Sequence, residues 1–359
     1  MNIRVTKRAD MPKKQEYIVR IIAVLLSIVF AGLILLAFGL NPIKIFVTII
    51  KGSIGSKIRL QQTVIRCIPL LITSLGIMVA FKMKFWNIGA EGQITMGALG
   101  ATWVALHLPE TLPAPVMLGA MMLAAVLCGG FWAFIPAIFK AKMGTNETIF
   151  TLMMNYIAIK FVTYLQYGPW MDPNAGGFPR IAKFPQNAVL PSLFGANIGW
   201  VFGLIFVVLV FFFMNYTKKG YEIAVIGESV ETARYAGMNI GRIIIVATFI
   251  SGGLCGIVGM IQASAIEKTL TSTIAAGYGF TAIIPAWLSR LNAVSNLFIC
   301  IAFAMLIQGG NYLQVSIGVS SAVASIVQGV ILFFVLGSEF FLQYKVSFGN
   351  KSGHSKEVA

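Results

Sequence analysis

The sequence predicts an all-α protein, a polytopic bundle of transmembrane helices that crosses the membrane about ten times. Two observations support this fold class. Of the 359 residues, 58% are hydrophobic and only 11% are charged, with a mean hydropathy of +0.85. Apolar runs of about 20 residues also recur along the whole chain, and ~20 residues suffice to cross a ~30 Å hydrocarbon core. A soluble domain carries about 25% charged residues, so a soluble fold is excluded.

About ten segments have the length of a membrane span, and nine or eleven spans remain possible because the eighth is short and poorly bounded. The predicted spans are residues 20–40, 62–81, 92–108, 116–139, 147–166, 196–214, 242–262, 277–292, 295–313 and 320–341. The first run is longer than the 7–15 residues of a signal-peptide core and ends at no small-residue cleavage site, which indicates a retained span. We therefore expect one transmembrane domain over residues 20–341, with tails at 1–19 and 342–359.

The distribution of basic residues predicts the orientation of the chain. Most of the 27 Lys and Arg fall in segments that share one side of the membrane with the N-terminus, and cytoplasmic loops carry such an excess. Both tails are therefore predicted to be cytoplasmic. The net charge of +15 does not indicate nucleic acid binding, because these charges sit in short clusters at the ends of apolar runs. The cluster from Lys44 to Arg59 is the exception, and we expect it along the outer interface.

Two connections are long. Residues 168–195 contain Pro169, Pro173, Pro179, Pro185 and Pro191. Proline interrupts regular helix and strand pairing, so this connection is predicted to be an extended external loop. Residues 215–242 are charged, contain no proline, and are predicted to be cytoplasmic.

A polar run interrupts the apolar sequence between the second and third spans: Phe85-Trp86-Asn87-Ile88-Gly89-Ala90-Glu91-Gly92-Gln93. A charge at the bilayer centre costs about 2.5–3.5 kcal/mol on insertion scales, and non-helical backbone at membrane depth needs protein or a water-filled cavity around it. Asn87, Glu91 and Gln93 are therefore candidates to line a pathway or a gate near its cytoplasmic end. The alternative is a tightly packed helix start, in which Glu91 caps the helix and pairs with Lys82 or Lys84. Glycines at 89, 92, 97 and 100 favour close helix packing.

A second constellation begins at Gly144-Thr145-Asn146-Glu147. Thr145 or Asn146 suits an N-cap, and Glu147 suits the positive end of a helix. Asn155 and Tyr156, deeper in the same span, are candidates to contact a solute, and Lys160 needs a partner or a route to water. Residues 144–157 and 318–331 share a similar beginning, which hints at an inverted repeat.

A third constellation lies in the cytoplasmic connection, from Glu228 to Gly237. Ser229 can cap a helix, Glu231 suits its first turn, and Gly237 suits a left-handed stop. Such a short helix is unstable alone, so it must dock on its own protein or on a partner subunit. Docking on a partner would bury Ala233, Tyr235 and Ala236.

Motifs of catalysis are missing from the sequence. No phosphate-binding loop, paired-aspartate metal motif or nucleophile elbow occurs, and the four cysteines lack metal-ligand spacing. We predict that the chain is not an enzyme, that it has no catalytic or metal-binding residue and no bound cofactor, and that any ATP is hydrolysed by another polypeptide.

In their order and spacing, the three constellations resemble the membrane subunits of ATP-binding-cassette (ABC) importers. The resemblance covers about residues 15–345 and is to the branched-chain amino acid, simple sugar and nucleoside permease superfamily. The nucleoside-type branch, which pairs with a basic-membrane-protein-like lipoprotein, is the most similar. The motifs that carry the resemblance are the run from Asn87 to Gln93, Gly144 to Glu147, Met154-Asn155-Tyr156, Ala233 to Gly237, and Gln328 to Phe333. The Asp-Leu-Ser-Val-Gly run typical of the sugar permeases is missing.

This resemblance implies the assembly in which the chain works. It implies two permeases, here a heterodimer, in a bacterial inner membrane. It also implies a separate ATPase that binds ATP and magnesium, and an extracellular binding lipoprotein that faces the loop 168–195. The coupling helix that contacts the ATPase would comprise Glu228, Ser229, Glu231, Ala233, Arg234, Tyr235, Ala236 and Gly237.

The resemblance implies a nucleoside as cargo, in a permease that tolerates purines; a sugar or a branched-chain amino acid is the alternative. A nucleoside needs polar partners for its ribose and base edges, and an aromatic surface for its ring. The candidate polar partners are Asn87, Glu91, Gln93, Asn146 and Asn155, and the candidate aromatic partners are Trp86, Tyr156 and Trp287. An ion-coupled secondary transporter, in which Glu91, Glu147 and Lys160 serve ions, is a different alternative.

Overall fold

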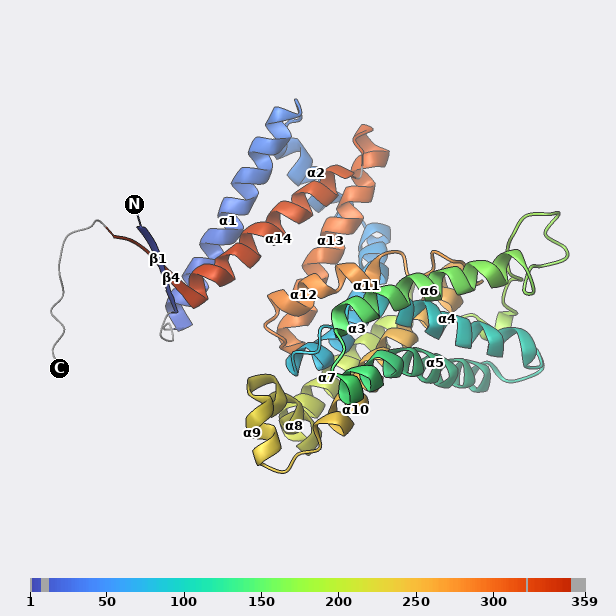
Figure 1. Cartoon of the computed structure of the whole chain (residues 1–359). Helices are drawn as coiled ribbons and strands as arrows, with labels where there is room; N and C mark the ends of the chain where they lie inside the picture. Colours follow the sequence, from blue (N-terminus) through green and yellow to red (C-terminus); the bar gives the residue numbers. More distant parts are fainter. Residues whose placement is uncertain (1, 8–12, 321, 350–359) are drawn as a thin grey trace. The chain divides into compact units, whose positions relative to one another are not determined.

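The computed structural model describes residues 2–7, 13–320 and 322–349 of the chain. It divides into two compact units, Ser53–Gln308 and the pair of terminal segments Met1–Gly52 and Gly309–Ala359. The predicted tails at 1–19 and 342–359, and the second half of the hinted repeat at 318–331, lie partly outside the described residues. Figure 1 labels helices α1 to α14 and strands β1 and β4.

The terminal unit is built from two long helices and the ends of the chain. Helices α1 (Lys13–Ala37) and α14 (Ala322–Gln343) pack on each other, and the rings of Phe30 and Phe334 lie 5.4 Å apart. Strands β1 (Asn2–Lys7) and β4 (Tyr344–Gly349) pair antiparallel, with Ile3 opposite Phe348. The two tails predicted to share one side of the membrane therefore meet in a small sheet.

Helix α2 (Pro42–Ile54) follows α1 after a bend of 115°. It contains the first part of the basic cluster that begins at Lys44, which we expected along the outer interface. At its C-terminal half it packs closely on α13 (Ala293–Ile317), because a Cβ atom added at Gly309 would overlap the backbone of Ile49.

The larger unit holds the remaining helices, and we give their bounds together. They are α3 (Lys57–Lys82), α4 (Ala90–His107), α5 (Ala114–Met143), α6 (Glu147–Tyr167), α7 (Gly199–Tyr216), α8 (Lys218–Glu228), α9 (Val230–Tyr235), α10 (Ile240–Ile261), α11 (Tyr278–Thr281) and α12 (Ile283–Leu288). Helix α10 continues as the π-helical turn η2 (Gln262–Glu267). Each predicted span from 62–81 to 242–262 thus coincides with one long helix.

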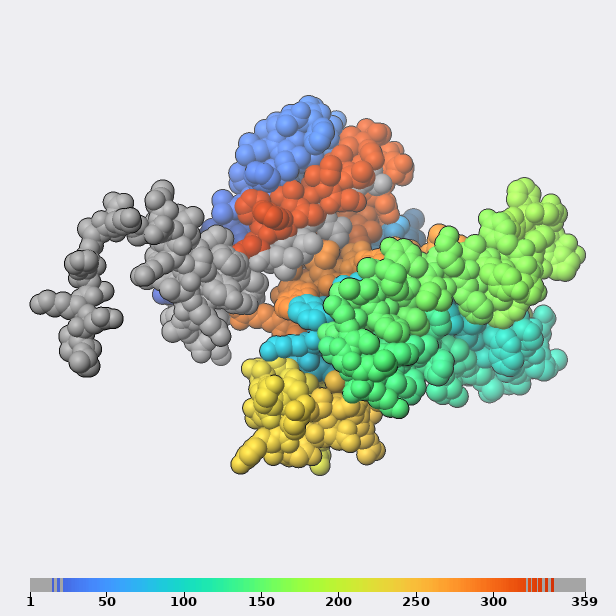
Figure 2. Space-filling model, in the orientation of Figure 1, coloured from blue at the N-terminus to red at the C-terminus, as the bar shows by residue number. Residues whose placement is uncertain are grey.

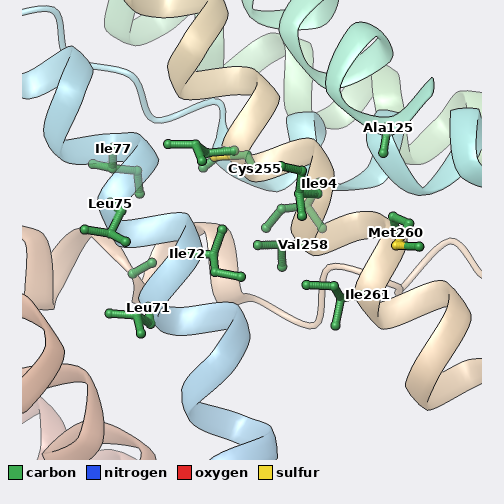
Figure 3. Close-up of a cluster of buried hydrophobic side chains, with 14 of the residues drawn as sticks. Leu71, Ile72, Leu75, Ile77, Ile94, Ala125, Cys255, Val258, Met260 and Ile261 are labelled. Atoms are coloured by element: carbon green, nitrogen blue, oxygen red, sulfur yellow. The ribbon is translucent and has the colours of Figure 1, made fainter. Parts of the chain in front are cut away.

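The core of this unit forms where α10 packs against α3, α4 and α5. Figure 3 shows Ile72 of α3 directed toward Val258 of α10, with Ile94 of α4 close to Cys255 and Val258, while Leu71 and Leu75 lie on the other side of α3. Glycines bring the helices together: a Cβ atom at Gly97 would overlap Gly256, and one at Gly100 would lie 2.6 Å from the sulfur of Cys128. The predicted close packing at Gly97 and Gly100 is confirmed, and it follows the rule that small residues let membrane helices approach.

The predicted eighth span, residues 277–292, differs from the structure. Two short helices, α11 and α12, replace the continuous helix. Gly277 has a φ of +76°, which starts α11 in a left-handed turn that glycine tolerates best. In the described part of the chain, six helices are long and apolar enough to cross a membrane, or seven if the bent pair of α1 and α2 counts as one span. The all-α membrane fold is confirmed, while the total of about ten spans stays a prediction.

The two long connections lie at opposite ends of the larger unit (Figure 1). The loop after α6 contains only short elements: η1 (Gln186–Ala188) and the two-residue strands β2 (Ser192–Leu193) and β3 (Ala196–Asn197). Helices α8 and α9 form the connection at the other end. That the two connections face opposite sides of the membrane stays a prediction.

Candidate translocation pathway and coupling segment

The polar run forms the turn between α3 and α4, and its amides bind each other. The side chains of Asn87 and Gln93 form a reciprocal pair: Gln93 Nε2 donates to Asn87 Oδ1 (2.9 Å), and Asn87 Nδ2 donates to Gln93 Oε1 (3.2 Å). Asn87 also donates to Ser251 Oγ of α10 (3.1 Å) and accepts from the backbone N–H of Gly89 (3.0 Å). Both side chains are buried, and Asn87 uses both its donors and its carbonyl oxygen.

Asn155 joins the same turn from α6. Its Oδ1 accepts from the backbone N–H of Gly92 (2.8 Å), and its Nδ2 donates to the carbonyl of Ile88 (2.9 Å). A Cβ atom at Gly92 would lie 3.0 Å from the Cα of Asn155, so only glycine allows this approach without displacement. We call Asn87, Gln93 and Asn155 the amide cluster; it fixes the turn to α6 and α10.

Glu91 binds the broken segment rather than a lysine. Its carboxylate accepts hydrogen bonds from the backbone N–H groups of Gly277 and Gly279, both at 2.8 Å. The alternative pairing with Lys82 or Lys84 is not formed. The side chain is 6% exposed, and it satisfies N–H groups at the start of α11 that have no intrahelical partner. Glu91 therefore ties α4 to the segment that interrupts the eighth predicted span.

An aromatic cluster lies beside the turn. The rings of Trp86 and Trp287 stack with centroids 5.2 Å apart and planes inclined by 21°, and Phe81 packs against both. Trp86 is 40% exposed and Trp287 is 38% exposed. Of the candidate aromatic partners, these two come together, and both residues are partly exposed.

Asn146 and Glu147 start α6, as predicted. Asn146 Oδ1 accepts from the backbone N–H groups of Thr148 (3.0 Å) and Ile149 (3.2 Å), so Asn146 is the N-cap. Glu147 forms an ion pair with Lys140 at 2.7 Å. Asn146 and Glu147 thus bind groups near the start of α6 and are not part of the amide cluster.

One face of α6 is exposed along much of its length. Tyr156, Lys160 and Tyr164 recur at intervals of four residues, which places them on one side of the helix, and all three are exposed. Figure 2 shows the surface of α6, in green, uncovered on the visible face. Within the described residues, Lys160 has no hydrogen bond or ion pair. We call these three residues the exposed α6 face.

The predicted short helix in the cytoplasmic connection is α9, and its ends match the sequence signals. Ser229 Oγ accepts from the backbone N–H of Thr232 (3.1 Å), and Gly237 has a φ of +73°. The hydroxyl of Ser229 also donates to Glu231 Oε2 (3.2 Å). Hydrogen bonds from its own backbone N–H and from Ser229 hold the pKa of Glu231 below its ordinary value.

Ala233 differs from its predicted position. It is buried within this chain, whereas Tyr235 is 96% exposed and Arg234 and Ala236 are also exposed. Ala233 therefore anchors α9 to its own protein and leaves Tyr235 and Ala236 as the residues able to contact another subunit. One side of α9 packs on its own protein and the other side is uncovered, so docking on a partner subunit stays a prediction.

Helix α8 links this segment to the polar turn. A Cβ atom at Gly227 would overlap the carbonyl oxygen of Lys82, the last residue of α3, and would lie 3.4 Å from the Cα of Met83. Helix α8 thus packs directly on the backbone where the turn that carries the amide cluster begins.

Comparison with known proteins decides the family. The model of the family described as "branched-chain amino acid transport system / permease component" matches residues 59–336. The chain belongs to this permease family. It is a transport subunit of the ABC type and a multi-pass protein of the bacterial plasma membrane.

Three relatives of the permease are informative. It is 32% identical to the glucose ABC transporter permease protein TsgB13 of Haloferax volcanii, over 96% of this chain and 94% of the relative. It is 28% identical to the nucleoside ABC transporter permease protein NupB of Lactococcus lactis, over 90% of this chain and 91% of the relative. It is also 28% identical to the guanosine ABC transporter permease protein NupP of Bacillus subtilis, over 89% of this chain and 93% of the relative.

Sequence reasoning missed three partners of the site in the permease. Ser251 binds Asn87, and Gly277 and Gly279 bind Glu91 through their backbones. The two glycines, spaced by one residue inside a short and poorly bounded span, were a usable signal of a broken helix. Ser251 lies in an otherwise apolar helix and offered no comparable signal.

Proposed function

We propose that this permease forms the translocation pathway for nucleosides, with purines among them, and that it works in an importer powered by a separate ATPase. The observation that carries the proposal is the exposed α6 face, where Lys160 lies between Tyr156 and Tyr164. A lysine within a membrane helix costs about 2.5–3.5 kcal/mol on insertion scales, so its side chain belongs in a watery pathway or near the interface, away from lipid tails.

Aromatic rings flanking a cation suit a nucleoside. Tyrosine rings provide flat surfaces for a purine, and their hydroxyls, with the Lys160 ammonium, can bind ribose oxygens and base edges. The stacked Trp86 and Trp287 provide a second partly exposed aromatic surface. The residues of the amide cluster and Glu91 hold the turn and α11 in place in this conformation. We therefore assign them a gating role, and assign solute contact to Trp86, Trp287 and Tyr156.

The partners follow from the family and from the coupling segment. We propose that Tyr235 and Ala236 of α9 contact an ABC ATPase, which binds ATP and magnesium on its own chain. We further propose a second permease that completes the pathway as a heterodimer, and an extracellular binding lipoprotein that docks at the loop 168–195. The full-length similarity to nucleoside and guanosine permeases supports the cargo.

Glucose is the second candidate cargo, because the permease is also similar over its full length to a glucose permease. One experiment separates the candidates. The complete complex with its binding protein is reconstituted, and ATP hydrolysis is measured with guanosine, adenosine, glucose and leucine. Stimulation by the nucleosides alone is expected; stimulation by glucose or leucine alone would overturn the cargo assignment.

A further inference from the structure

The larger unit carries an apolar slot that the proposed pathway does not use. It has a volume of about 310 Å³ and lies between α3, α7 and α13. Its walls include Leu60, Val64 and Leu71 of α3, Trp200 and Leu204 of α7, and Ile301 of α13. The one hydroxyl in the wall, that of Thr63, donates to the carbonyl of Ser53 (2.8 Å). The slot therefore offers hydrocarbon surface to an occupant.

The length of the slot matches half a bilayer. Its wall on α3 runs from Leu60 to Leu71, which at 1.5 Å per residue is about 16 Å along the helix. The hydrocarbon core is about 30 Å thick, so one leaflet is about 15 Å deep. An acyl chain that enters at the Leu60 end would reach the middle of the membrane at Leu71.

The mouth of the slot is basic. Lys57 precedes Leu60 by three residues, so it lies on the same face of α3, one turn beyond the slot, and it is exposed. Arg59 lies next to it, and residues 42–66 contain no Asp or Glu. In the predicted orientation, these residues belong to the basic cluster that violates the positive-inside pattern. An anionic group seated at this mouth would balance their charge.

We propose that the slot binds one acyl chain of an anionic phospholipid of the outer leaflet, with its phosphate against Lys57. The apolar walls of the slot bind the acyl chain. The ammonium group of Lys57 selects an anionic head group, as basic residues do for anionic lipids. The site is separate from the exposed α6 face and from α9, and it does not depend on the nature of the cargo.

Photocrosslinking of the complete complex tests this site. The complex is reconstituted with phosphatidylglycerol that carries a diazirine in its acyl chain, and crosslinked peptides are identified by mass spectrometry. Crosslinks are expected on the peptides that contain Leu60–Leu71 and Trp200–Leu204. The same probe with a phosphatidylcholine head group is expected to label these peptides at least fivefold less.

Two variants and two controls sharpen the test. Gly203→Leu fills the slot, and its Cβ atom meets Leu71 at an ordinary 3.4 Å; Lys57→Glu reverses the charge at the exposed mouth. Each is expected to lower labelling at least fivefold, whereas Gly119→Leu, in an open surface groove, and Lys183→Glu, in the long loop, leave it unchanged. Equal labelling by the two head groups, or undiminished labelling in both variants, would overturn the proposal.

Discussion

At the scale of single residues, Glu91 is a structural link between two helices. Its carboxylate receives two backbone N–H groups of the broken segment, 186 and 188 residues further along the chain. Hydrogen bonds to a charged group contribute about 1.5–3 kcal/mol each. The position of α11 therefore depends on this side chain.

We predict that Glu91→Gln keeps the complex assembled but lowers uptake at least tenfold. The amide retains one acceptor oxygen and presents an NH₂ group to the second backbone N–H, so one hydrogen bond is lost, at a cost of about 1.5–3 kcal/mol. Uptake into proteoliposomes and thermal unfolding measure both effects. Glu110→Gln, at an exposed position, serves as the control. Normal uptake together with unchanged stability in Glu91→Ala would reduce Glu91 to a dispensable cap.

Replacing Lys160 tests whether the exposed α6 face lines an aqueous pathway or contacts lipid. If this face lines the pathway, Lys160→Met lowers nucleoside uptake several-fold and leaves thermal stability unchanged. If it faces lipid, removal of the charge stabilises the protein by up to about 2.5–3.5 kcal/mol and uptake stays normal, contrary to our assignment. Lys142→Met, exposed near the end of α5, is the matched control.

At the scale of elements, α9 is a short helix with one buried side and one exposed side. Ala233 packs into its own chain, and Tyr235 projects outward. Because α8 contacts the last residue of α3 through Gly227, a displacement of α9 can be transmitted through α8 to the turn that holds the amide cluster. We expect substitutions on the outer side to affect ATPase binding without unfolding the permease.

We predict that Tyr235→Ala weakens ATPase binding at least tenfold, about 1.4 kcal/mol, because exposed tyrosines at interfaces are frequent hot spots. Co-purification of the ATPase and cargo-stimulated hydrolysis measure the loss. Tyr167→Ala, also at an exposed position but at the opposite end of the larger unit, is the control. Wild-type co-purification in both Tyr235→Ala and Ala236→Trp would contradict the assignment of α9 as the coupling helix.

Elements governed by local sequence were predictable. The ends of α9 follow from Ser229 and Gly237, and the start of α6 follows from Asn146, because capping involves residues two to three positions apart. The contact of Glu91 with Gly277 and Gly279 was not predicted, since it joins segments 186 and 188 residues apart in the chain. Likewise, the exposure of Tyr235 beside the burial of Ala233 depends on how α9 packs, which no local pattern encodes.

At the scale of the whole molecule, the composition sufficed for the membrane class, and the motifs sufficed for the family. The arrangement of long connections at opposite ends of the larger unit agrees with a chain that meets a binding protein on one side and an ATPase on the other. The polar run from Phe85 to Gln93 was expected to line a pathway or a gate near its cytoplasmic end. In this conformation its polar side chains are buried and bound to the protein. We therefore propose the exposed aromatic residues as the groups that contact the solute.

The central claim is that this permease moves a nucleoside with energy from ATP hydrolysed on another chain. Radiolabelled guanosine uptake is measured in proteoliposomes that contain either the complete complex or this chain alone, with and without ATP, and with sodium and proton gradients. We predict accumulation only with the complete complex, its binding protein and ATP. Accumulation by this chain alone, driven by an ion gradient, would contradict the claim and identify a secondary transporter.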